Sequence, residues 1–576
     1  MAENFTSMRQ KLLMRWGQMK TERASWWGHW QEISTYLLPW NGRYFRQDRD
    51  KGIRRNNQIY DNTAIRALRT LGAGLMAGAT SPARPWFRLA THDPSLNEVQ
   101  DVKLWLEEVT QRMHAVFQKS NTYRALQQIY EELGAFGTGA SIVLPDFKSV
   151  IHHYPVTIGQ YAIASDWQGN INAIYREFEK PVNEIVQEFG IDNCSPTVQS
   201  LYNTGQLASW IPIVHAIEPR LDRDPNKRDA KNMEWASYYF ELSGETDKCL
   251  RESGFKRFPA VVPRWAVAGG DIYGNSPGME ALGDIKQLQH EQLRKAQGID
   301  YQTNPPLQVP DSLKNRDVER LPGGITFVPA TGAGKVETAF DVALNLNELL
   351  VDIQDVRQRI ERSFFADIFL MLANSNNPQM TATEVAERQE EKMLMMGPVL
   401  ERLNNELLYP LVETTFLHMV EMGALPPSPQ QLAGAELNVE FVSMLAQAQR
   451  AIGTNSIDRF VGSLGTVAQM KPDVLDKFDS DAWADVYSDS LGVDPKLVLG
   501  TDQVVIIRKA RAQAQAAQAK IAAAQQASAA TKNFAQASAA TQGTPESPVS
   551  LQRASAALVN QEGDETNPVS MFSGYQ

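Results

Sequence analysis

The sequence has 576 residues, beyond the size at which a single hydrophobic core keeps growing, so it predicts several packed units, roughly four by length alone. Hydrophobic residues make up 43% of the chain and charged residues 21%, as in ordinary folded proteins, so most of the chain can bury a core. The formal net charge of −11 argues against a protein that grips nucleic acid tightly, because that affinity comes from Lys and Arg side chains that neutralise phosphates. It does not exclude a protein that lets nucleic acid slide past.

The sequence contains two cysteines, Cys194 and Cys249. They are too few for a disulfide framework and lack the spacing of a metal site, which favours a reducing compartment. The N-terminus has no apolar leader, and no window approaches the roughly 18 consecutive apolar residues of a membrane span. We therefore expect a soluble, cytoplasmic protein with no membrane partner.

The first third of the chain shows helical patterns. Apolar residues recur every three to four positions over 5–38, which predicts one helix that Pro39 ends. A helix rich in small residues, suited to close packing, precedes Ser81-Pro82. Two more helices are predicted over 101–118 and 123–133.

Residues 140–265 change to short runs rich in Val, Ile, Tyr and Phe, which Gly, Asn and Pro divide. This pattern predicts a mostly β region. The stretch "DWQGN" at 166–170 is typical of a hairpin turn, and one short helix is expected near 181–189.

Helical periodicity returns over 277–297 and 344–372, and these two predicted helices flank a small β insert at 299–340. A polar loop follows, and Thr381 with Glu384 then forms a capping box. The helix that this box opens is expected to reach residue 423, with a break at Gly397-Pro398.

The C-terminal part shifts in composition. A mixed helical segment is expected at 436–500, after which residues 503–545 contain no acidic residue and are dominated by Ala and Gln. Ala and Gln favour helix, which predicts a basic helical extension. A frayed or disordered tail is the alternative. Residues beyond 544 are expected to be disordered.

Two glycine-rich stretches resemble nucleotide-binding motifs and fail their structural requirements. Residues 72–77 match G-x-G-x-x-A, but this motif needs a preceding strand, and the segment before it has a helical pattern, so tight helix packing is the better interpretation. The stretch "TGAGKV" at 331–336 has Pro329 where a phosphate loop needs Gly, and Val336 where it needs Ser or Thr. We expect no cofactor.

No metal or catalytic constellation can be recognised. His152 and His153 are adjacent, so on a strand they point to opposite faces and cannot jointly hold a metal. No carboxylate spacing singles out an acid and base pair. An enzyme is unsupported by these patterns, although they do not rule one out.

A basic loop at 41–56 interleaves cations with aromatic residues. It is a candidate phosphate contact, or a solvated loop that contacts another subunit, which the interspersed Asp48 and Asp50 favour. Its cations are Arg43, Arg46, Arg49, Lys51, Arg54 and Arg55.

Several landmarks in one order resemble the portal, or head-to-tail connector, protein of short-tailed bacteriophages. The resemblance covers about residues 5–425. Each piece alone is weak, whereas the ordered set is specific. The landmarks are "SPARPWFRL" at 81–89, "FGTGA" at 136–140, "DWQGNINAIYREF" at 166–178, "VHAIEPR" at 214–220, "ESGFKRFPAVVPRW" at 252–265, "DIYGNSPGMEALGDIKQL" at 271–288, "NPPL" at 304–307 and "MTATEVAER" at 380–388.

The resemblance implies a ring, usually of twelve subunits, at one capsid vertex of the virion, assembled in the host cytoplasm. Double-stranded DNA is packaged and ejected through its channel. The implied partners are the terminase large subunit, tail adaptor or nozzle proteins, and the major capsid and scaffolding proteins. The family has no catalytic activity of its own, because ATP hydrolysis belongs to terminase.

The resemblance also implies an α+β, mainly helical subunit with a wing, a helical stem, a small β-rich clip, a crown and a possible helical barrel. We place these parts as follows: wing 1–276, stem helices 277–298 and 344–372, clip 299–343, channel loop 373–382, wing or channel helix 383–430, crown 431–502, barrel or tail 503–545, and disordered tail 546–576.

Three sets of site residues follow from this plan. Uncharged amides can touch phosphates weakly without a tight grip, so the polar loop is expected to face DNA; a solvent-exposed connection with no DNA role is the alternative. The DNA-facing loop residues are Asn374, Ser375, Asn376, Asn377 and Gln379. The possible barrel contacts are Arg508, Lys509, Arg511, Lys520 and Lys532. The possible clip contacts with partners are Lys314, Arg316, Asp317, Glu319 and Arg320.

Two other functional classes compete with the conduit. A virion-associated enzyme acting on nucleic acid or cell wall would assemble its active site from residues distant in sequence. A capsid scaffold or internal core protein is disfavoured by the order of helix, β insert, helix, polar loop and helix.

Overall fold

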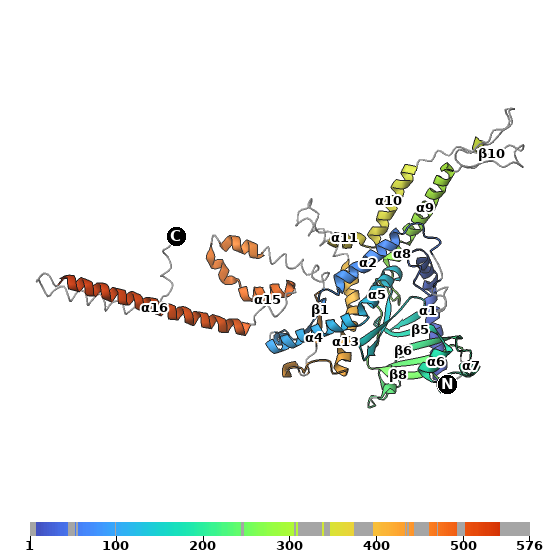
Figure 1. Cartoon of the computed structure of the whole chain (residues 1–576), viewed down its shortest axis with the longest axis horizontal. Coiled ribbons are helices and arrows are strands. Elements are labelled where there is room, and N and C mark those ends of the chain that lie inside the picture. Colours follow the sequence, from blue (N-terminus) through green and yellow to red (C-terminus); the bar gives the residue numbers. More distant parts are fainter. Residues whose placement is uncertain are drawn as a thin grey trace. The chain divides into compact units, whose positions relative to one another are not determined.

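The computed structural model describes residues 7–43, 52, 56–97, 99–227, 229–243, 247–303, 307–308, 337–338, 346–373, 396–432, 434, 437–442, 460–468, 471–491 and 501–541. It is mainly helical with several small antiparallel sheets, as expected (Figure 1). The chain divides into two units, Met1–Val493 and Asp494–Gln576.

The expected N-terminal helices are present. They are α1 (Met8–Tyr36), α2 (Thr63–Ala79), α4 (Gln100–Lys119) and α5 (Thr122–Phe136), with a short α3 (Pro94–Asn97). The Ser7 hydroxyl caps α1 by accepting a hydrogen bond from the Gln10 amide. Along α1, Trp16 packs against the larger sheet, and Trp30 lies in the main core. One long helix therefore joins two cores.

The larger sheet has five antiparallel strands in the order β4-β5-β6-β7-β8. Its strands are β4 (Tyr161–Ser165), β5 (Ile171–Pro181), β6 (Trp210–Pro219), β7 (Trp235–Glu241) and β8 (Arg251–Phe255). The expected hairpin turn at 166–170 joins β4 to β5. The α1 side chains cover one face, and α6 (Val182–Phe189) and α7 (Pro196–Asn203) pack on the other. The sequence predicted α6 and missed α7.

A smaller sheet, in the order β3-β2-β9, consists of β2 (Ala140–Asp146), β3 (Val150–Val156) and β9 (Ala260–Val261). On β3 the His153 side chain is buried, whereas His152 is partly exposed. The expectation that these adjacent histidines point to opposite faces is confirmed.

A buried carboxylate ties α5 to the two chain segments beside it. Glu132, which is 1% exposed, accepts hydrogen bonds from the Asn41 amide (2.7 Å), the Thr157 hydroxyl (2.5 Å) and the Ile158 backbone N–H (3.2 Å). Burial raises the pKa of Glu132 to about 7, although these three donors act in the opposite direction.

The predicted helix over 344–372 is not continuous, and this is a correction. The structure has α10 (Leu346–Ser363) and α11 (Ala366–Ala373), separated at Phe364-Phe365, where Phe365 has a left-handed φ of 55°. The break lets Phe364 become fully buried and carries α11 across α2. At that crossing a Cβ on Gly74 would lie 2.2 Å from the Phe369 ring, which confirms that this glycine serves close packing.

The expected break at Gly397-Pro398 falls in the first turn of a helix that the structure describes from residue 396 to 403, and the residues before 396 lie outside the described part of the chain. An irregular turn that the sequence did not predict lies further on, where a π-helical turn (Asn404–Leu408) leads into α13 (Tyr409–Glu421). Pro410 has no N–H to donate to the preceding turn, which is a physical reason for a local change in hydrogen-bond pattern there.

Residues 437–441, expected within the crown, contact the N-terminal part of the chain. After a 3-10 turn (Gln430–Leu432), β12 (Leu437–Phe441) pairs with β1 (Phe87–Thr91), and Arg88 forms an ion pair of 2.8 Å with Glu440. Alternating strand residues and this ion pair place 437–441 with the N-terminal helices. Helical residues 460–468, a 3-10 turn (Pro472–Lys477) and α15 (Ser480–Leu491) follow.

The second unit contains one long helix, α16 (Thr501–Thr541), so the expected helical extension is confirmed over these residues. From 503 to 533 its side chains are exposed, apart from Val504, which is intermediate. Residues 542–576, which include the expected disordered tail, lie outside the described part of the chain.

Candidate functional site

The candidate site is built on a pair of helices. After α8 (Pro277–Glu280), α9 (Leu282–Thr303) packs against α10 in antiparallel fashion (Figure 1). Arg359 of α10 forms an ion pair of 3.3 Å with Asp284 of α9. Beyond the helices β10 (Leu307–Gln308) pairs with β11 (Glu337–Thr338). The segments that leave the two helices therefore meet again, as expected for a β insert between paired helices. The apolar seam is formed by Ile285, Leu288, Ile353, Val356 and Ile360.

Further along the pair the seam becomes polar. Burial, and then the neighbouring Asp352 carboxylate, raise the pKa of Glu291 on α9. Two carboxylates that face each other weaken helix pairing when both are ionised. The interaction between α9 and α10 is therefore stronger near Asp284 than near Glu291.

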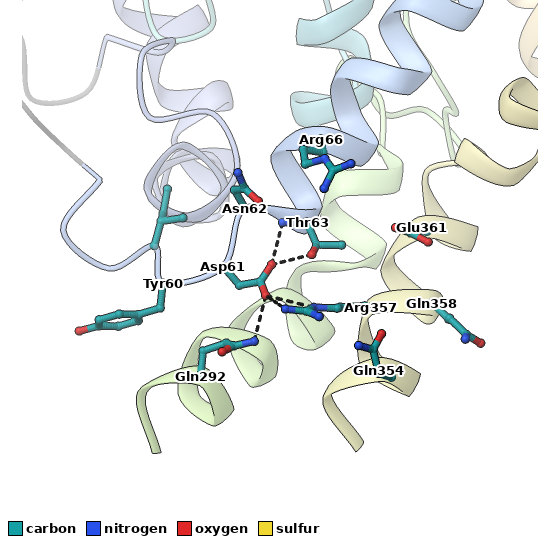
Figure 2. Close-up of a pocket in the computed structure, with 11 residues that line it drawn as sticks. Tyr60, Asp61, Asn62, Thr63, Arg66, Gln292, Gln354, Arg357, Gln358 and Glu361 are labelled. Carbon is teal, nitrogen blue, oxygen red and sulfur yellow. Dashed lines mark hydrogen bonds and ion pairs between the residues drawn. The ribbon is translucent and has the colours of Figure 1, made fainter. Parts of the chain in front are cut away.

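Asp61, which lies just before α2, connects the helix pair to the rest of the subunit (Figure 2). Its carboxylate accepts hydrogen bonds from Arg357 of α10 (2.7 and 3.1 Å) and from Gln292 of α9 (3.0 Å). It also accepts from the backbone N–H (2.8 Å) and the hydroxyl (2.5 Å) of Thr63. One side chain thus joins both helices of the pair to the start of α2.

A second contact fixes the backbone at the same point. The side-chain oxygen of Gln289 accepts hydrogen bonds from the N–H groups of Tyr60 (2.6 Å) and Asp61 (2.8 Å). The side-chain amide of Gln289 donates to the Asp61 carbonyl (2.9 Å). Gln289 is buried, so these bonds satisfy polar groups that water does not reach.

The electrostatics of Asp61 favour a structural role. Burial alone would raise its pKa, but the bonds from Thr63 and Arg357 outweigh burial, and the pKa lies below the ordinary value. The carboxylate therefore stays ionised and engaged by several donors. Such a group holds a joint together and is a poor general base.

A polar cavity of about 730 Å³ opens beside this joint. Figure 2 shows Arg66 on the α2 side and Glu361 on α10 at its border, with Gln354 and Gln358 beside Arg357. Its wall offers amides, guanidinium groups and carboxylates, and no histidine or cysteine. Across the described residues, no group of three His, Cys, Asp or Glu is arranged to hold a metal ion. These residues can hold the neighbouring helices together, and the residues that line the cavity show no catalytic geometry.

A second joint fixes the helix that precedes α13. Glu406, in the π-helical turn, accepts hydrogen bonds from the Arg264 side chain (2.7 and 3.2 Å), from the Arg264 backbone N–H (2.8 Å) and from Arg402 (3.1 Å). Arg264 is 6% exposed, and it also donates to the Gly169 carbonyl (2.9 Å). This joint connects the helix to the turn between β4 and β5.

The predicted site residues fall into three groups. The channel-loop residues 374–379 and the clip residues 314–320 lie outside the described part of the chain, and α11 ends at Ala373, directly before the loop. Of the basic loop, Arg43 is described. It donates to the Glu177 carbonyl (2.6 Å) within its own subunit.

The five predicted barrel cations all lie on α16, but they do not share one face. At about 100° per residue, Lys509 and Lys520 lie within about 20° of each other. Arg508 and Arg511 lie about 60° apart, and Lys532 lies about 120° from Lys520. One face of this helix can therefore present Lys509 and Lys520 together, but not all five.

The sequence did not single out Asp61, Gln289, Gln292 or Arg357. The Asp-Asn-Thr run at 61–63 is a signal for a helix start, and it could have indicated Asp61. No local pattern connects it to glutamines more than 200 positions away, because helix-surface Gln and Arg residues usually face solvent.

The comparisons with known proteins agree with the predicted family. Residues 9–499 match the family model described as bacteriophage head to tail connecting protein. The chain is 63% identical over 512 residues to a probable portal protein of Bordetella phage BPP-1, which covers 88% of this chain and 92% of the relative. It is 46% identical over 514 residues to the portal protein of Salmonella phage epsilon15, which covers 89% and 92%.

Among solved structures, the chain is similar to one in the virion of a native gene transfer agent particle, at 12% identity and a TM-score of 0.29, covering 70% of this chain and 90% of that one. In the described part of the chain, no helix is long and apolar enough to cross a membrane. The family is structural, which confirms the expectation of a non-catalytic protein. From the family match and the two relatives, the chain belongs to the bacteriophage head-to-tail connecting proteins.

Proposed function

We propose that this chain is a portal subunit, and that a ring of about twelve copies at one capsid vertex conducts double-stranded DNA during packaging and ejection. Family membership supports the portal role. The observation that best supports this mechanism is the antiparallel pair of α9 and α10, which Asp61 connects to the start of α2. Repeated around a ring, such pairs form a rigid collar.

The loop at 374–379 faces the DNA in this proposal. It begins where α11 ends, and α11 is held against α2 at the Gly74 and Phe369 contact. The described residues resume in a helix that the Arg264–Glu406 joint anchors. A polar loop between two anchored helices can touch a moving duplex through weak amide contacts, because amides do not displace the counterions of phosphates as Lys or Arg would.

The α16 helix forms part of a barrel that meets packed DNA. Lys509 and Lys520, which share one face, are the residues best placed to contact phosphates together. Replacing both by Glu should reduce DNA packaging. Lys532→Glu on another face is the matched control and should have the smaller effect. If truncation after residue 500 left packaging and ejection unchanged, the barrel would have no role in either.

The clip was expected at 299–343, but α9 continues to Thr303, so the clip begins after that residue. It binds the terminase large subunit during packaging and tail adaptor or nozzle proteins afterwards. The pairing of β10 with β11 beyond the helix pair supports this assignment. The expected contact residues remain Lys314, Arg316, Asp317, Glu319 and Arg320. Assembly with major capsid and scaffolding proteins, in the host cytoplasm, belongs to the same proposal.

The test of this function is an in vitro packaging assay with the channel loop replaced. Changing residues 374–377 to a Gly-Ser linker should leave ring assembly intact and reduce the amount of DNA translocated or retained. A Gly-Ser replacement of the same length at 224–227, in an exposed turn, is the matched control and should package normally. Normal packaging by the loop variant would contradict the DNA-facing role, and loss of the ring would show that the loop is structural.

A further inference from the structure

The turn between β4 and β5 presents a tryptophan to solvent. Trp167 is 91% exposed, although an indole ring is large and mostly apolar and is usually at least half buried. An exposed aromatic side chain of this kind is typical of a binding hot spot. Trp167 therefore needs an explanation beyond the fold of its own chain.

This turn is rigid. The Asp166 carboxylate accepts hydrogen bonds from the backbone N–H groups of Gln168 and Asn170, both at 2.9 Å, and Gly169 adopts a left-handed φ of 86°. Arg264 anchors the Gly169 carbonyl to the core. Because the turn is already ordered, little conformational entropy is lost in it when a partner binds Trp167.

A cavity of about 690 Å³ lies along the second half of the same hairpin strand, on the sheet face opposite α1. Its wall has aromatic rings and charges of both signs, with the cations Arg176, Lys180 and Arg251 and the carboxylates Glu177, Glu179, Glu184 and Glu188. The guanidinium of Arg176 lies 4.8 Å from the Phe178 ring centroid and 5.9 Å from that of Tyr154. Tyr154 and Trp210 in the wall are 42% and 38% exposed. Such walls accept an indole by stacking and cation–π contact.

The cavity also has an unsatisfied cation. Within the described part of the chain, Arg176 forms no ion pair, and its buried Nε atom has no hydrogen-bond partner. The other cavity cations are engaged, since Arg251 and Lys180 both pair with Glu188. Of the wall carboxylates, Glu188 pairs with Lys180 and Arg251, and Glu179 pairs with Arg43. Arg176 is the wall cation that can pair with an incoming carboxylate, and Asp166 lies directly beside Trp167.

Trp167 cannot fill this cavity in its own chain. From Ile171 to Phe178, β5 extends about 23 Å at about 3.3 Å per residue, which separates the turn from the cavity. A projecting group at one place and a complementary cavity at another make a head-to-tail contact between copies, which closes into a ring when the rotation permits.

We propose that Trp167 and Asp166 of one copy dock into the cavity around Arg176 of the next copy, and that this contact closes the ring. The inference rests on the proposed portal function and names an interface for it. The indole stacks against Arg176 and the aromatic wall, and the carboxylate pairs with the guanidinium.

The test uses full-length chains and light scattering after size exclusion. Trp167→Ala removes the projecting group, and Glu184→Trp fills the cavity mouth from an exposed helix position. Each variant alone should need at least about 10-fold more protein to form rings than the unmodified chain. Trp167→Phe should restore most of the assembly. Phe147→Ala is the matched control, because Phe147 is 100% exposed at the tip of the β2–β3 hairpin and is not part of the contact.

Mixing the two variants gives the sharpest readout. A Trp167→Ala chain keeps the cavity and a Glu184→Trp chain keeps the projecting group, so an equal mixture should form heterodimers and stop there. Normal rings from Trp167→Ala would overturn this contact and leave the proposed portal function standing. An unmodified chain that never self-associates, even with capsid and scaffolding proteins present, would overturn both. Full rings from the mixture would show that the two features do not pair.

Discussion

The α1 and α16 helices differ in what holds them together. In α1, Leu12, Trp16 and Met19 are buried against the larger sheet and Trp30 lies in the main core. In α16, Ile506 and Ile521 are 67% and 59% exposed, and helix formation rests on Ala and Gln propensity. Tertiary burial therefore stabilises the first unit, whereas a helix without such burial is only marginally stable until a partner covers it.

The largest effect should come from emptying the core that α1 enters. Trp30 is 0% exposed and contacts Tyr273 edge to face, with ring centroids 4.9 Å apart. Trp30→Ala should lower the free energy of unfolding by about 3–5 kcal/mol, because it leaves a large cavity. Ile521→Ala in α16 should change it by less than about 0.5 kcal/mol. Denaturant titration of both variants checks the contrast, and equal losses would contradict it.

The next largest effect should be a pH dependence of the free energy of unfolding of the first unit. The pKa of Glu132 is raised from an ordinary 4.5 to about 7, so the folded state binds a proton more tightly than the unfolded state. This contribution to stability is present at low pH and is lost as pH rises through about 7. Between pH 5 and pH 8 the free energy of unfolding should fall by about 2–3 kcal/mol.

Glu132→Gln removes the titrating group and should flatten this part of the profile. Chemical denaturation at pH 5, 6, 7 and 8 measures it. A slope that persists in the variant would assign the pH dependence to other groups.

The joint at the foot of the helix pair should give an effect of about 2 kcal/mol. Asp61→Asn leaves Arg357 and Gln292 without their anionic partner, and partly buried donors that lose a charged acceptor are costly. Because the pKa of Asp61 lies below its ordinary value, this contribution is present at neutral pH and is lost as pH falls below about 4. Hydrogen exchange should show faster opening at residues 56–62 in the variant.

Glu361→Gln at the border of the same cavity is the control for this joint. It should leave both the unfolding midpoint and the exchange unchanged. Equal effects from the two substitutions would mean that the cavity as a whole, rather than Asp61, holds the helices.

The smallest effect on the packed unit should come from weakening α16. Ala523→Gly together with Ala524→Gly should cost about 1 kcal/mol per residue in local helix stability and reduce the helical circular dichroism signal. Substitution of the same two residues by Gln should preserve most of that signal. The unfolding midpoint of the first unit should not move. A shift in that midpoint would show that α16 stabilises the first unit.

The sequence predicted what local patterns determine. The periodicity of α1, the β region at 140–265 and the turn at 166–170 depend on neighbouring residues, and all three are confirmed. The pairing of β1 with β12 was missed because two five-residue strands lie about 350 positions apart, and no local signal fixes their register.

Tertiary packing also overrode local preference. The pattern over 344–372 continues across Phe364, yet the helix breaks there because burying Phe364 and crossing α2 at Gly74 outweigh helix continuation. The Asp61 joint could be predicted only in part, since its donors come from three different elements.

The measurement that tests the central claim most directly is imaging of the purified full-length chain by electron microscopy, with class averages taken along the symmetry axis. We predict closed rings of about twelve subunits, with a central opening wide enough for duplex DNA. Monomers or dimers that never close into rings, at any protein concentration and with capsid and scaffolding proteins present, would contradict the portal account.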